Sequence, residues 1–108
     1  MDNIAPELQE IVGRYRNQLE KLGIRISAIF LFGSWKTGTN REGSDIDLIV
    51  VSSDFSRMGL RKRLEILGVA AARILEPIEA YGVTPEEIEK NAVPAFWAET
   101  LKKESVKV

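Results

Sequence analysis

Residues 29–51 read IFLFGSWKTGTNREGSDIDLIVV, and this stretch decides the fold. Apolar runs on both of its sides have the length and the branched and aromatic content of buried β-strands, which we place at residues 24–32 and 45–51. The segment between them, residues 33–43, holds three glycines, two threonines and an asparagine. We therefore expect two strands joined by a long, turn-rich loop.

Amphipathic helices are predicted on both sides of this stretch. Apolar residues recur at three- and four-residue spacing over residues 4–22, and again over residues 60–75, where Pro77 ends the pattern. Residues 52–57 are polar and indicate a loop between the second strand and the second helix. The core sheet is thus expected to have helices before and after it.

The last third of the chain predicts one more strand and two more helices. Residues 78–83 form a short strand, and Thr84-Pro85-Glu86-Glu87 has the composition of a helix start with a capping box. A last helix is expected over residues 94–101, and residues 105–108 could add a short strand. The element order indicates an α/β (α+β) fold, a small mixed β-sheet flanked by helices.

Length and composition narrow the class of protein. A chain of 108 residues is expected to form a single domain, residues 1–108. With 44% hydrophobic residues, 29% charged residues and a net charge of -1, it is typical of a globular domain with no general attraction to nucleic acid. No apolar run reaches the ~20 residues of a membrane helix, so we expect a cytoplasmic protein with no membrane partner.

The absence of cysteine and histidine limits the metal chemistry. The chain has no residue of either type. It therefore has no disulfide framework, and it lacks the commonest transition-metal ligand and the usual general base at neutral pH. Any metal must be held by oxygen atoms, which points to Mg²⁺ or Mn²⁺.

Gly33 and Ser34 follow the first predicted strand. A glycine there allows a sharp turn and a close approach of the backbone to a ligand. If a helix begins at Ser34, its free N–H groups would face an anion such as a triphosphate. A Gly-Ser turn by itself is common, and taken alone it favours an ordinary loop.

Asp45 and Asp47 stand where the second predicted strand begins. Residues two apart in a strand point to the same side, roughly 6–7 Å apart at the backbone. Two carboxylates beside an apolar run repel each other and are costly to desolvate, and divalent cations would remove that cost. Alternatively, both aspartates face solvent at a strand end.

Glu79 is a third acid, in the middle of a short apolar strand. Acids are poor strand formers, so its presence invites a functional reason, although an outward-facing surface glutamate is the plain alternative. Together with a phosphate cradle, three carboxylates would suit phosphoryl or nucleotidyl transfer with two metal ions. Because the chain has no histidine, Glu79 is the expected base for an acceptor hydroxyl.

The spacing of these residues resembles that of a known family. Gly33-Ser34, ten further residues and then Asp45-Ile46-Asp47 are similar to the signature of the polymerase-β-like nucleotidyltransferases, above all their minimal nucleotidyltransferase domains. The resemblance implies that Gly33 and Ser34, with Lys36 and Ser44, contact a nucleoside triphosphate. It implies two bound magnesium ions held by the acids Asp45, Asp47 and Glu79.

The resemblance also suggests partners and shows departures. Minimal domains of this kind often pair with a helical protein of the HEPN class as antitoxin and toxin, and some adenylylate that toxin. The third acid of the family is usually aspartate, whereas here it is Glu79. Trp35 and Lys36 stand where arginine and small residues are common. Lys36 could neutralise triphosphate charge or keep the loop solvated.

Two surface patterns leave alternatives open. Arg57, Arg61, Lys62 and Arg63 form a basic group that would suit a polynucleotide or an acidic partner, although a solvated helix flank is favoured. Phe96, Trp97 and Leu101 form an apolar stripe that fits the core or an interface between copies.

Two main functions fit these observations, and a third, weaker alternative is a sensor that binds ATP and metal without turnover. The first is a metal-dependent nucleotidyltransferase that moves a nucleoside monophosphate from a triphosphate, with ATP expected, to a partner protein. The second is a binding module that neutralises a HEPN-type partner with little or no catalysis. The three acids beside apolar strands favour the first function, because a scaffold would not need them.

Overall fold

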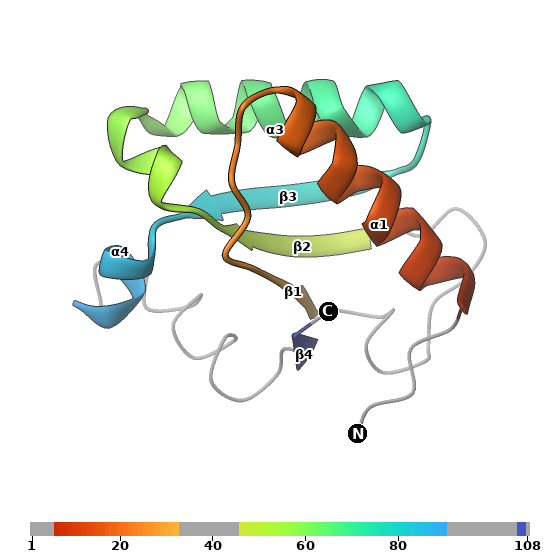
Figure 1. Ribbon diagram of the computed structural model, residues 1–108, viewed down its shortest axis with the longest axis horizontal. Coiled ribbons are helices and arrows are strands. Elements are labelled where there is room, and N and C mark those ends of the chain that lie inside the picture. The colour runs from red at the N-terminus through yellow and green to blue at the C-terminus, as the bar shows by residue number, and fades with distance from the viewer. Residues whose placement is uncertain (1–5, 33–45, 91–105, 108) are drawn as a thin grey trace.

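The computed structural model describes residues 6–32, 46–90 and 106–107 (Figure 1). None of the helices in these ranges is long and apolar enough to cross a membrane. In chain order the elements are α1 (Pro6–Lys21), β1 (Ala28–Phe32), β2 (Ile46–Val51), the 3₁₀-helix η1 (Ser53–Arg57), α3 (Leu60–Ile74), β3 (Ile78–Val83), α4 (Pro85–Glu89) and β4 (Val106–Lys107).

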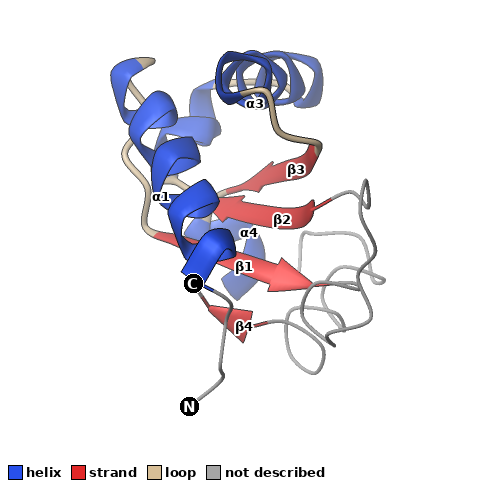
Figure 2. Ribbon diagram, turned by 90° about the vertical axis from the view of Figure 1, so that its right-hand side faces the viewer, coloured by secondary structure: helices blue, strands red, loops and turns tan. Residues whose placement is uncertain are grey.

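The four strands form one mixed sheet in the order β3-β2-β1-β4 (Figure 2). β1 pairs antiparallel with both β2 and β4, and β2 pairs parallel with β3. The parallel pair needs a crossover connection, which α3 supplies. The fold class predicted from the sequence, a small mixed sheet flanked by helices, is confirmed.

The main core lies between the sheet and the two long helices. Helix α1 buries residues at four- and three-residue spacing, and alternate residues of β1 and β2 meet them from the sheet. Within this layer the hydroxyl of Tyr15 donates to the carbonyl of Leu67 at 2.9 Å and so ties α1 to α3. Burial raises the pKa of Tyr15 well above its ordinary value.

A smaller cluster covers the opposite face of the sheet. It contains Ala28, Ile49, Val51 and Val83, with Ile88 of α4 packed against it. Because β2 contributes buried residues to both clusters, it reads as a nearly continuous apolar run. This explains why the sequence pattern identified β2 so clearly.

β1 is shorter than the sequence predicts. The predicted strand began at residue 24, whereas β1 begins at Ala28. The backbone N–H of Ile24 donates to Leu19 at the end of α1, and that of Arg25 donates to the carboxylate of Asp54 at 2.7 Å. These two N–H groups therefore form hydrogen bonds with the end of α1 and with a side chain. They are not available for hydrogen bonds to a neighbouring strand.

The sequence predicts a loop over residues 52–57, but residues 53–57 form the 3₁₀-helix η1. The hydroxyl of Ser52 caps it by accepting from the N–H of Asp54 at 3.1 Å. Phe55 is fully buried in the main core, where its ring lies against Gly82 of β3. One aromatic side chain in a polar stretch thus converts the connection into part of the core.

Helix α3 buries only part of its predicted apolar stripe. Leu67, Ala71 and Ile74 are buried, whereas Leu60 and Leu64 are 61% and 41% exposed. The helix ends at Ile74, and the next residue, Leu75, adopts the left-handed conformation and is exposed. The amphipathic pattern therefore extends beyond what the described core covers.

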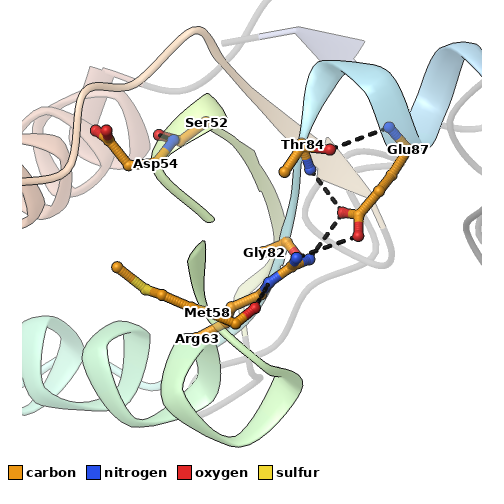
Figure 3. A network of polar contacts seen from close by, with 7 residues as sticks. All are labelled: Ser52, Asp54, Met58, Arg63, Gly82, Thr84 and Glu87. Carbon is orange, nitrogen blue, oxygen red and sulfur yellow. Dashed lines mark hydrogen bonds and ion pairs between the residues drawn. The ribbon is translucent and has the colours of Figure 1, made fainter. Parts of the chain in front are cut away.

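Arg63 connects four elements (Figure 3). Its guanidinium makes two hydrogen bonds to Glu87 of α4, at 2.7 and 3.1 Å, and also donates to the carbonyls of Met58 and Gly82 at 3.1 Å each. It lies 5.8 Å from the centre of the Phe55 ring. The expectation of a solvated basic flank is wrong for this residue, whose side chain is only 12% exposed.

Glu87 also completes the start of α4. Its carboxylate accepts from the N–H of Thr84 at 2.8 Å, and its own N–H donates to the Thr84 hydroxyl at 3.0 Å. The predicted capping box is thereby confirmed. The predicted strand at the tail is confirmed as β4, and the helix predicted over residues 94–101 lies outside the described residues.

We predict that Gly82→Ala destabilises the protein. A Cβ at Gly82 would stand 2.8 Å from the ring of Phe55, which is fully buried. Overpacking of this kind costs about 1–3 kcal/mol of unfolding free energy. Chemical denaturation measures the change, and Gly13→Ala is the control. Nothing lies within 4 Å of a Cβ at Gly13, so this helix substitution should stabilise instead. Equal effects of the two substitutions would contradict the close contact.

We predict that the Arg63–Glu87 pair makes the free energy of unfolding fall as the pH is lowered into the acid range. The hydrogen bond from Arg63 lowers the pKa of Glu87 below its ordinary value of 4.5. A group with a lowered pKa stabilises the fold fully above its unfolded pKa and loses this effect as the pH falls through the folded value. Glu87→Gln should therefore cost about 1–3 kcal/mol at neutral pH, and this difference should shrink below about pH 4.5.

Urea denaturation at several pH values measures this difference. Glu65→Gln is the control, because Glu65 lies 3.8 Å from Lys62 in an exposed pair, which contributes under about 1 kcal/mol. A Glu87→Gln deficit that stays constant down to acid pH would show that the charge of Glu87 is not involved.

Candidate functional site

Asp47 and Glu79 lie side by side in the sheet. Asp47 is the second residue of β2 and Glu79 the second residue of β3, and the parallel register pairs them directly. Neighbouring strands are about 4.8 Å apart. The structure therefore brings together two of the three acids predicted as site residues. The sequence alone does not predict this pairing, because it does not reveal the register of the strands.

Both carboxylates belong to the same face of the sheet. Side chains alternate along a strand, so Asp47 shares its face with Ile49, and Glu79 shares its face with Tyr81. Ile49 and Tyr81 belong to the smaller cluster, on the face opposite to α1 and α3. The two acids thus lie at one end of that face, next to the smaller cluster, where β2 and β3 begin.

The surroundings of the two acids differ. Asp47 is half-buried, whereas Glu79 is exposed on a strand at the edge of the described sheet. Like charges on adjacent strands repel each other, and the half-buried carboxylate has less water to screen it. A cation bound between them would relieve this repulsion.

The end of β1 meets the same place. Phe32, its last residue, is paired with Asp47 across the antiparallel ladder. The sequence predicts the phosphate-binding segment from Gly33 onward. Phe32, Asp47 and Glu79 occupy consecutive strands at one level of the sheet, so three segments far apart in the sequence converge there.

The other predicted site residues lie outside the described part of the chain. These are Gly33, Ser34, Lys36, Ser44 and Asp45. Their roles as nucleotide and metal contacts remain predictions. Among the described residues no group of three or more acids, histidines or cysteines is placed to hold a metal ion.

The donor set nevertheless suits a hard divalent cation. Asp47 and Glu79 offer only carboxylate oxygens, and the chain contains no histidine or cysteine that would favour a softer metal. Glu79 stands in register with Asp47 and has the longer side chain. Because Glu79 is exposed, packing does not hold its carboxylate away from Asp47. The residues present fit Mg²⁺ or Mn²⁺.

A hollow lies beside Glu79 that was not predicted from the sequence. A cavity of about 300 Å³ lies between α3 and β3, lined by Leu64, Leu67, Gly68, Ile78, Glu79, Ala80 and Tyr81. The break that Gly68 makes in the apolar pattern of α3 was the available signal, because a residue without a side chain leaves space on a helix surface.

Comparisons with known proteins identify the family of the chain. Residues 12–105 match the model of the nucleotidyltransferase domain family, and the chain belongs to that family. No protein in the curated set shows a significant sequence match.

Two solved structures share the fold. A candidate nucleotidyltransferase from Sulfolobus solfataricus is 17% identical with a TM-score of 0.62, over 91% of this chain and 76% of that one. A crystal structure of a toxin-antitoxin with AMP-PNP contains a chain that is 19% identical with a TM-score of 0.62, over 92% of this chain and 69% of that one. At this identity the likeness concerns the fold.

We predict that Mg²⁺ stabilises the protein through Asp47. A ligand at a hundred times its dissociation constant adds about 2.7 kcal/mol to the unfolding free energy, which raises the melting temperature by roughly 10 °C. Thermal denaturation with and without Mg²⁺ measures the shift, which should vanish in Asp47→Asn. Glu89→Gln, which removes an exposed acid of α4, should keep it. An equal shift in both variants would show that the ion binds elsewhere.

Proposed function

We propose that this protein is a metal-dependent nucleotidyltransferase, which transfers a nucleoside monophosphate from a nucleoside triphosphate to a hydroxyl group of a partner protein. The observation that carries the proposal is the in-register pair Asp47 and Glu79 in a member of the nucleotidyltransferase domain family. We propose ATP as the donor, because a chain with the same fold was crystallised with AMP-PNP, an analogue of ATP.

The metal sites are proposed at the three acids. Asp45 and Asp47, with Glu79, would hold two Mg²⁺ ions through their carboxylate oxygens. When bound, the ions would neutralise phosphate charge and stabilise the leaving pyrophosphate. Gly33, Ser34, Lys36 and Ser44 are the proposed contacts of the triphosphate.

The proposed reaction needs a base for the acceptor hydroxyl, and the exposure of Glu79 suits it to that role. In the reaction an acceptor oxygen forms a bond to the α-phosphorus, and the bond from that phosphorus to the oxygen leading to the β-phosphate breaks, so that pyrophosphate leaves. The proton of the acceptor hydroxyl needs a base. Glu79 is proposed for this role because it is exposed on the face of the sheet opposite to α1 and α3, directly beside Asp47.

A second function is favoured by the toxin-antitoxin neighbour. That structure shares the fold of this chain. A role as an antitoxin that binds and neutralises a helical HEPN-type toxin is therefore the alternative proposal. In such a protein the fold would serve recognition, and catalysis would be weak or absent.

The decisive experiment supplies the purified protein with Mg²⁺ and each nucleoside triphosphate labelled at the α-phosphate, with and without the protein encoded beside it. We expect label transfer to the partner, reduced about a hundredfold or more in Asp47→Asn and in Glu79→Gln. Glu89→Gln, an exposed acid remote from the pair in sequence, is the matched control and should retain full activity.

The outcomes separate the two functions. Transfer that is lost in both acid variants, while their melting temperatures stay close to that of the wild type, supports the enzyme. A stable complex with the partner, with no label transferred by any variant, would replace it with the binding function. Transfer that survives both substitutions would remove Asp47 and Glu79 from the proposed site.

A further inference from the structure

The outer edge of β3 carries a defined set of backbone groups. The carbonyls of Pro77 and Val83 accept from Ile46 and Ser52, so the odd-numbered residues of this segment face β2. In a parallel ladder alternate residues direct both N–H and C=O to the same side. The even-numbered residues Ile78, Ala80 and Gly82 therefore direct theirs outward, away from the sheet.

The two ends of this edge are already paired. The N–H of Ile78 donates to the carbonyl of Glu76 at 2.9 Å, and the carbonyl of Gly82 accepts from Arg63 at 3.1 Å. Four outward groups remain, and none of them is paired within the described part of the chain: the C=O of Ile78, the N–H and C=O of Ala80, and the N–H of Gly82.

An apolar stripe of α3 runs beside this edge. All the large hydrophobic residues that are exposed in the described chain lie on α3 or on the residue that caps it. Leu60 and Leu64 share one side of the helix with Gly68, at four-residue spacing, and the exposed Leu75 follows the end of the helix. The hollow of about 300 Å³ separates this stripe from the edge of β3.

We propose that a second copy of this chain docks on this surface, its β3 antiparallel to the first about a two-fold axis at Ala80. The four unpaired groups are self-complementary in this arrangement. Each Ala80 donates to and accepts from the other, and the N–H of each Gly82 donates to the C=O of the other Ile78. This pattern leaves out only the N–H of Ile78 and the C=O of Gly82, which are already paired with Glu76 and Arg63.

The side chains are complementary under the same axis. The two α3 helices would lie antiparallel, and Gly68 at the middle of each would let them approach and cover Leu64. A second copy therefore fits both the hydrogen bonds of the β3 edge and the exposed apolar stripe of α3.

The arrangement brings the two candidate sites together. Residues whose numbers add up to 160 face each other, so Glu79 would stand opposite Tyr81 of the second copy on the same face of the joined sheet. Tyrosine at that distance can contact the carboxylate. The dimer itself does not depend on catalysis, and its test uses no substrate.

The first test compares two substitutions of equal exposure. Leu64 and Val69 are 41% and 40% exposed on the same helix, but Val69 lies outside the stripe. Sedimentation velocity across a range of protein concentrations should show a dimer for the wild type and for Val69→Lys. Leu64→Lys should weaken dimerisation at least tenfold. A monomeric wild type, or equal behaviour of the two variants, would overturn the proposal.

The second test addresses the register. The natural chain has no cysteine, so a single Ala80→Cys variant carries one thiol. A short thiol-to-thiol cross-linker should join two Ala80→Cys chains and leave Val69→Cys chains separate. Ala80→Pro removes one outward N–H without touching the ladder to β2, and should weaken the dimer.

Circular dichroism verifies that each variant is folded. A folded Ala80→Pro variant that dimerises as strongly as the wild type would refute strand pairing, as would a lack of cross-linking at position 80. A monomeric wild type that instead binds an extended segment of another protein at this edge would replace the second copy with that partner.

Discussion

The parallel pairing of β2 with β3 is the constraint on which the rest of this structure depends. A parallel pair requires a crossover, and the crossover is α3, which in turn supplies Leu67 to the core and Arg63 to the polar network. The same register sets Asp47 beside Glu79. A shift of one residue would turn every side chain of β3 to the opposite face and separate the two acids. Fold and candidate site therefore rest on one set of backbone hydrogen bonds.

Much of this arrangement could be predicted from the sequence because its signals are local. The apolar run of β2, the periodicity of α1 and the capping box of Thr84 and Glu87 each depend on residues close in the chain. Asp47 and Glu79 were identified from their unusual positions in apolar strands. Their pairing could not be derived, because a register is decided by the packing of whole elements and leaves no mark at either residue.

The features that escaped prediction depend on contacts between distant residues. Arg63 belongs to a basic group that reads as a solvated flank, but its ion pair with Glu87, 24 residues later, makes it a largely buried connector. Two further hydrogen bonds, to the carbonyls of Met58 and Gly82, reduce the cost of removing the charge from water. The first residues of the predicted first strand likewise form hydrogen bonds with Leu19 and Asp54, which no local pattern reveals.

The contact of Phe55 with Gly82 has a consequence for how this fold can vary in length. Connections between strands and helices are usually the places where related proteins gain and lose residues. Here the connection from β2 to α3 carries a core side chain, and its backbone is fixed by the Ser52 cap at one end and by the hydrogen bond of Arg63 to Met58 at the other. An inserted residue would withdraw the ring from Gly82 and open a cavity in the main core. Relatives that preserve this packing must take up their differences in length at other connections.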